Sequence, residues 1–152
     1  MGKLPRYALI LFASAMLLSS EARARQAVSL QIELGRGFGE FTVVNSGEAV
    51  ALHSQVSVER KVNDQWESVP MTNLSLREKC GVGKTSTCHK LAAQEILHPM
   101  PWTGNFCTSQ CPSSCRLDGP APPGTYRFTV TLCDRSKTFT SPAFEKRDPQ
   151  AK

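Results

Sequence analysis

The sequence lacks long apolar runs, is poor in aromatic residues and contains only three histidines. Its 152 residues are 40% hydrophobic and 7% aromatic. The longest apolar stretch, residues 8–18, is too short to cross a bilayer, so we expect no transmembrane segment in the mature chain. A G-x-S-x-G nucleophile motif is absent, and the basic residues form no stripe that could follow a phosphate backbone. We therefore predict a protein that is not an enzyme, needs no cofactor and binds no nucleic acid.

The beginning of the chain has the pattern of a secretory signal peptide. Lys3 and Arg6 precede the apolar stretch, and residues 22–24 (Ala-Arg-Ala) supply a small-x-small cleavage sequence. We expect residues 1–24 to be removed, which leaves 128 residues with 15 basic and 12 acidic side chains and a net charge of +3. The sequence therefore predicts a secreted or periplasmic protein.

All six cysteines follow this segment, and their even number in an oxidising compartment predicts three disulfides. Six cysteines allow 15 pairings, among which the sequence alone does not choose. A rival interpretation is a metal site, because the C-x3-C-x3-C cluster and the nearby His98 are residue types that bind zinc. Export favours disulfides, and we predict no metal site. The cysteines are Cys80, Cys88, Cys107, Cys111, Cys115 and Cys133.

Alternation of apolar and polar residues predicts an all-β domain over residues 25–145, followed by a polar tail over residues 146–152. Turn signals separate short strands by roughly 8–12 residues, which is typical of an antiparallel sandwich or barrel. We expect Trp66 in the core, and Pro142 indicates an edge or a bulge. The expected strands are 28–34, 41–44, 50–62, 66–69, 74–77, 87–97, 125–133 and 137–145, of which 87–97 also fits a helical stripe.

The strand at 125–133 also gives the orientation of a cysteine. Large apolar residues occupy every second position from Tyr126 to Leu132 and face the core, so Cys133 faces outward. We expect its disulfide partner in a segment that crosses the outer face of the sheet, and the candidates are Cys107, Cys111 and Cys115. Cys80 and Cys88 then close the short loop between them.

Residues 98–124 differ from the rest of the chain. They contain six of the ten prolines, three cysteines and three glycines, and proline disfavours regular structure because it lacks a donor and restricts its neighbour. Long irregular stretches in compact domains are usually functional or crosslinked. We therefore predict a disulfide-stapled Pro/Cys-rich loop. Met100, Trp102 and Phe106 are its candidate partner-binding residues, because large apolar side chains on a rigid loop can anchor a partner.

Two short stretches resemble extracellular immunoglobulin-like and fibronectin-like domains. Residues 123–128 (Pro-Gly-Thr-Tyr-Arg-Phe) are similar to a turn in such domains where a tyrosine near the strand start anchors a corner. Residues 58–66 resemble a hairpin with a tryptophan on its return strand. The chain is also similar to small exported bacterial proteins of uncharacterised function. The resemblance implies an antiparallel immunoglobulin-like β-sandwich, although position 128 is phenylalanine where antibody domains carry a core cysteine.

These features predict a non-enzymatic binding or structural module of the cell envelope or extracellular space. We expect its partner to be a protein or an envelope component, contacted through the loop at 98–124. An alternative is a disulfide-braced inhibitor of a secreted protease or other hydrolase, which would insert the same loop into a cleft. A third hypothesis is an enzyme or metal protein that uses Cys107, Cys111, Cys115 and His98.

Overall fold

The computed structural model describes residues 27–70, 72, 74–76, 88–106 and 119–148. This part of the chain is all-β and contains no helix, and so it has no helix long and apolar enough to cross a membrane. Its pairings are antiparallel, which confirms the all-β, antiparallel part of the predicted fold. The strands are β1 (Leu30–Leu34), β2 (Phe41–Asn45), β3 (Val50–His53), β4 (Gln55–Val62), β5 (Gln65–Ser68), β6 (Leu74–Ser75), β7 (Cys88–Leu91), β8 (Ile96–Leu97), β9 (Gly124–Thr131), β10 (Thr138–Thr140) and β11 (Phe144–Lys146).

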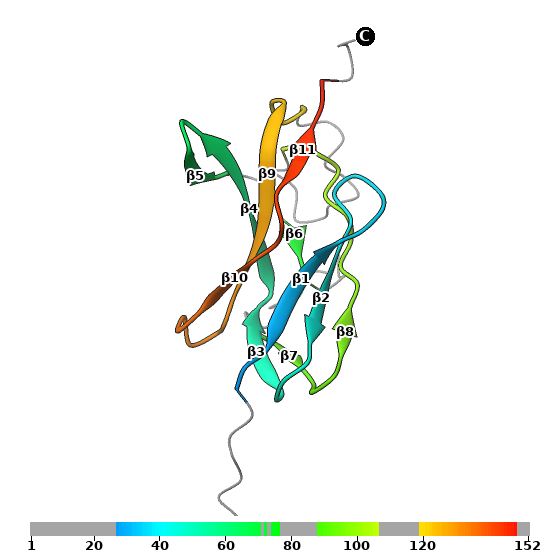
Figure 1. Cartoon of the computed structure of the whole chain (residues 1–152), viewed down its shortest axis with the longest axis vertical. Coiled ribbons are helices and arrows are strands. Elements are labelled where there is room, and N and C mark those ends of the chain that lie inside the picture. Colours follow the sequence, from blue (N-terminus) through cyan, green and yellow to red (C-terminus); the bar gives the residue numbers. More distant parts are fainter. Residues whose placement is uncertain (1–26, 71, 73, 77–87, 107–118, 149–152) are drawn as a thin grey trace, which may run out of the picture.

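The strands form three hydrogen-bonded sheets (Figure 1). The largest has the order β10-β9-β4-β5, with β11 also paired to β9 and β6 also paired to β4. A second sheet has the order β1-β2-β8, and β3 and β7 form a third. An isolated bridge between Leu52 and Leu132 connects β3 to the chain just after β9. The small sheet is therefore continuous with one end of the large sheet.

The core lies between β1-β2-β8 and the central strands of the large sheet. Phe41 of β2 stacks on Phe128 of β9, with ring centroids 4.4 Å apart. Val43, Val58 and Val130 are completely buried beside them. Burial of each such side chain contributes about 1.5–3 kcal/mol. The apolar residues that alternate with polar ones in the sequence thus form the inward faces of β2, β4 and β9.

A tyrosine fixes the entry to β9. The hydroxyl of Tyr126 donates to the carbonyl of Pro122 over 2.5 Å, and the guanidinium of Arg60 donates to the carbonyl of Pro123 over 3.0 Å. Burial raises the pKa of Tyr126, while the nearby charge of Arg60 acts in the opposite direction. Both side chains hold the turn at residues 122–124 against the strands.

A buried asparagine connects the other end of the domain. Asn45 is 1% exposed. Its side-chain amide donates to the carbonyls of Glu48 and Ala92 over 2.7 and 2.8 Å. Its side-chain oxygen accepts from the backbone of Gly47 over 3.1 Å. The side chain is therefore fully used, and it joins the turn after β2 to the turn between β7 and β8.

The disulfide of the described part joins Cys88 of β7 to Cys133, which follows β9. The predicted pairing of Cys88 with Cys80 is therefore wrong, and so is the predicted pairing of Cys133 with a loop cysteine. The orientation was predicted correctly, because Leu132 is buried and Cys133 is not. The partner comes from β7 because β7 pairs with β3, and Ala51 of β3 also accepts the backbone N–H of Cys133. Cys80, Cys107, Cys111 and Cys115 lie outside the described residues.

The segment expected as one strand at 50–62 is two strands in different sheets. The chain bends at Ser54, whose carbonyl accepts the backbone N–H of Leu76 over 2.8 Å and the hydroxyl of Ser75 over 3.2 Å. The pairing of β6 with the start of β4 accounts for this bend. The segment at 87–97 is likewise two strands, β7 and β8, and the helical alternative is wrong.

The last expected strand, at 137–145, is divided into β10 and β11 at Pro142. Both halves pair with β9 at the edge of the sheet, where a proline is tolerated. In the gap, Ser141 replaces the missing strand contacts: its hydroxyl accepts the backbone N–H of Phe128 over 2.9 Å. Its own N–H donates to the carbonyl of Phe128 over 2.9 Å.

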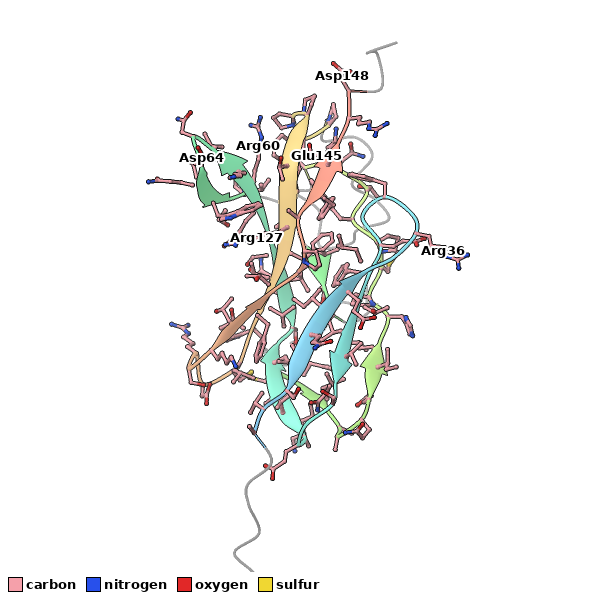
Figure 2. The ribbon with its side chains drawn as sticks, viewed as in Figure 1. Arg36, Arg60, Asp64, Arg127, Glu145 and Asp148 are labelled. Atoms are coloured by element: carbon pink, nitrogen blue, oxygen red, sulfur yellow. A yellow bond between two sulfur atoms is a disulfide. The ribbon has the colours of Figure 1, made fainter. Side chains whose placement is uncertain are left out.

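The expectation that Trp66 belongs to the core is wrong. β5 follows β4 through the two-residue turn Asn63–Asp64, and this turn sets Trp66 opposite Lys61 on the outer face. There the guanidinium of Arg127 lies 4.2 Å from the centre of the indole ring, and it pairs with Glu59 at 2.6 Å. The tryptophan is therefore covered by a cation rather than by the core. This cation, Arg127, is labelled in Figure 2.

Candidate functional site

The loop at 98–124 is irregular in its described parts, 98–106 and 119–123, where an isolated bridge joins Asn105 to Pro120. The three candidate partner-binding residues lie in the first of these parts. Trp102 is only 2% exposed, so its ring is not on the surface as expected of an anchor. Its indole N–H donates to the carbonyl of Asn105 over 3.1 Å. Met100 and Phe106 are half-buried.

Trp102 is covered by the loop between β1 and β2, which approaches it closely. The backbone N–H of Trp102 donates to the carbonyl of Gly39 over 3.0 Å. Gly39 has a φ of 71°, and a Cβ at this position would lie 2.0 Å from the carbonyl oxygen of Trp102. Only glycine satisfies both conditions. The turn between β1 and β2 therefore packs closely against the loop at 98–124.

This docking brings an aromatic ring to the surface. Phe38 is 46% exposed, and its ring centroid lies 5.9 Å from the rings of both Trp102 and Phe144. Phe144 in turn stacks on the core ring of Phe128 at 4.8 Å. An aromatic row thus extends from the core outward, and Phe38 is its exposed end.

Beside Phe38 the surface has an open hollow of about 450 Å³. Three segments line it: the β1–β2 loop at Phe38, the Pro/Cys-rich loop at residues 103–105 and Pro120, and the end of β11 at residues 145–147. Gly104 is buried in its wall, with a φ of 76°. A Cβ at Gly104 would come within 2.8 Å of the Phe38 ring and 3.0 Å of the Lys146 stem. The absence of a side chain at Gly104 therefore lets the Phe38 ring and the Lys146 stem pack against its backbone.

The register of β11 places its two charged side chains, Glu145 and Lys146, on opposite faces of the strand. Lys146 is paired with Gly124 and shares the inward phase of Phe144, whereas Glu145 is paired with Thr125 on the outer face. The carboxylate of Glu145 accepts the hydroxyl of Thr125 over 2.5 Å. Figure 2 shows Glu145 at this end of the molecule, where the chain leaves β11. Within the described residues, neither Lys146 nor the exposed Arg147 takes part in an ion pair.

No family model, curated protein or solved structure matches this chain. The candidate site is therefore defined by geometry: an exposed aromatic ring, an open hollow and two cationic side chains. Phe38 is the residue that sequence reasoning missed. The sequence does indicate its exposure, because Phe38 lies in a glycine-rich turn and not on the inward face of a strand, where it could be buried in the core.

The rival metal interpretation depends on residues that the structure describes only in part. His98 is exposed, and the three cysteines of the C-x3-C-x3-C cluster lie outside the described residues. Among the residues that are described, no group of three or more histidine, cysteine, aspartate or glutamate side chains is arranged to hold a metal ion. The chemistry that the hollow beside Phe38 offers is apolar contact next to the charged residues Glu145, Lys146 and Arg147.

Proposed function

We propose that this chain is a secreted or periplasmic, non-enzymatic binding or structural module that contacts a protein or envelope component through the hollow beside Phe38. The observation that supports this most is the exposure of Phe38, because an exposed aromatic ring on a supported surface is a typical anchor at protein interfaces. Trp102 and Phe144 hold the ring from below, so little side-chain freedom would be lost on binding.

The proposed compartment has support from sulfur chemistry. The Cys88–Cys133 disulfide is of the kind that persists in exported proteins and is rare in a reducing cytosol. The signal-like pattern in residues 1–24 agrees with it.

The finer fold assignment that we propose is a variant of the immunoglobulin-like β-sandwich, as in small exported bacterial proteins. The hydrogen bond from Tyr126 to Pro122 supports this assignment, because a tyrosine that bonds a few residues upstream at a strand entry is a hallmark of such domains. The disulfide lies elsewhere than the inter-sheet disulfide of antibody domains. Cys88–Cys133 flanks β3, and position 128 is a core phenylalanine.

Site-specific photocrosslinking in the cells that produce the protein tests the proposed function. A photoreactive phenylalanine analogue replaces Phe38 in one variant and Ile96 in another, because Ile96 is also an exposed apolar residue, at 54%, but belongs to β8 and does not line the hollow. We expect a discrete adduct from position 38 and none from position 96. No adduct from position 38, or equal adducts from both, contradicts the assignment of this surface.

A further inference from the structure

We propose that the hollow beside Phe38 binds an acidic segment of a partner protein, in which an apolar side chain is flanked by aspartate or glutamate. This inference rests on the proposed function and adds the chemistry of the partner. It follows from the apolar surface and the positive charge that meet at one place, on the three segments that line the hollow.

The apolar part of the site is the surface formed by Phe38, Pro120 and the bare backbone of Gly104. The Phe38 ring is supported by Trp102, which is buried and hydrogen-bonded to Asn105. The volume of about 450 Å³ lies within the range of roughly 300–1,000 Å³ that is usual for binding pockets. An inserted apolar side chain would therefore replace water on a surface that is already formed.

The charged part of the site is basic. Lys146 lines the hollow, and the Cε atom of its stem would lie 3.0 Å from a Cβ at Gly104. Arg147 follows it and is exposed. Long basic side chains commonly place the stem on apolar surface and the charge in water. Carboxylates on either side of the bound apolar residue would meet these two cations.

Two acidic side chains near the hollow are hydrogen-bonded to neighbouring groups of the chain. Glu145 accepts from Thr125 on the outer face, and the carboxylate of Glu40 folds back on its own loop to accept the backbone N–H of Gly37 over 2.8 Å. Neither forms an ion pair with Lys146 within the described part of the chain. The charged residues that line the hollow are one carboxylate, Glu145, and two cations, Lys146 and Arg147, so their net charge is +1, which favours an acidic segment over a basic one.

The test uses the full chain immobilised on a sensor and two pools of short synthetic peptides. Each peptide carries one central leucine, phenylalanine or methionine, flanked by aspartate and glutamate in one pool and by asparagine and glutamine in the other. We expect the acidic pool to bind at least about tenfold more tightly, a preference that weakens as salt is raised.

Four variants locate the binding. Lys146→Glu with Arg147→Glu reverses the charge of both cations and should abolish the preference for the acidic pool. Gly104→Ala places a Cβ 2.8 Å from the Phe38 ring and 3.0 Å from the Lys146 stem, so it should displace both and weaken the binding of the acidic pool. Gly119→Ala is the matched control for Gly104→Ala, because Gly119 also has a positive φ, of 91°, but its Cβ would meet nothing within 4 Å. Lys90→Glu with Lys137→Glu reverses two exposed charges that do not line the hollow, so it matches the change in net charge of the first variant. Both controls should bind as the unchanged chain does.

The outcomes separate this inference from the proposed function. Equal binding of the two pools, or an acidic preference that survives the charge reversal at Lys146 and Arg147, overturns the inference. Binding to vesicles that contain anionic phospholipid, without binding to either pool, overturns it in favour of a lipid surface. In each of these cases an adduct from position 38 to a protein still supports the proposed function, and the absence of that adduct refutes it separately. If Gly104→Ala fails to fold, the charge-reversal variant decides alone.

Discussion

The disulfide between Cys88 and Cys133 should contribute a large part of the stability of this domain. It closes a loop with a sequence separation of 45 residues. In the chain-entropy description, closing a loop of this size removes enough freedom from the unfolded chain to stabilise the fold by about 4 kcal/mol. The perturbation that tests this value is the double substitution Cys88→Ala and Cys133→Ala, which leaves no unpaired thiol at either position.

The expected loss is large enough to measure easily. For a domain of this length, 1 kcal/mol corresponds to roughly 4 °C in Tm, so the double variant should melt about 15 °C below the unchanged protein. Thermal unfolding followed by circular dichroism gives the value. The antiparallel pairing of β3 with β7 and the hydrogen bond from Cys133 to Ala51 remain, so the native fold should be retained at low temperature.

Two results would refute the reasoning. One is a double variant with a Tm within a few degrees of the unchanged protein, because the bridge would then not restrict the unfolded chain. The other is a peptide map of the unreduced protein in which Cys88 or Cys133 is linked to another cysteine. The map should be made first, since it tests the geometry independently of the stability.

Three further predictions follow from the packing. Asn45→Ala should lower the free energy of unfolding by about 2–4 kcal/mol in denaturant titrations, because it leaves buried backbone groups without partners; a loss below 1 kcal/mol would contradict this. Arg127→Ala should cost only about 0.5–1 kcal/mol, since its partner Glu59 is partly exposed, but should change the fluorescence of Trp66; unaltered emission would argue against the stacked geometry. Burial raises the pKa of Tyr126, so its stabilising contribution is complete below pH 10 and is lost as the pH rises through the higher pKa of the folded state. In a chain that lacks residues 1–24, Tyr126 is the one tyrosine, and absorbance titration should show its phenolate forming above the usual pH; titration at or below pH 10 would refute this.

Much of the sheet could be predicted because burial on one face imposes a period of two on the sequence. The strands at 41–44 and 125–133 were recognisable for this reason. The bend at Ser54 was not, because the alternation continues across it while the strand changes its partner. Such a change depends on the distant β6, whose pairing with β4 has no local signal in residues 50–62. Trp66 is different, because the two-residue turn at Asn63–Asp64 already sets it opposite Lys61, on a polar face.

The candidate site was predictable only in part, for a similar reason. The composition of residues 98–124 marks the loop region, and the described loop residues do line the hollow. The exposed ring at Phe38 comes from another segment, which docks on the loop through Gly39. The disulfide partner of Cys133 also comes from a distant strand, Cys88 of β7. Both are long-range pairings, and no local pattern in the sequence encodes them.

The interruption at Ser141–Pro142 has a consequence for how copies of this protein behave in a crowded space. An unbroken outer strand would offer a ladder of open backbone groups onto which another chain could add, and repeated addition leads to fibrous aggregates. Here the edge strand is divided into β10 and β11, of three residues each. Pro142, which lies between them, has no backbone N–H to donate. The exposed charge of Glu33 on β1 opposes growth at the rim of the neighbouring sheet. These two sheet edges are thus protected against self-templated polymerisation.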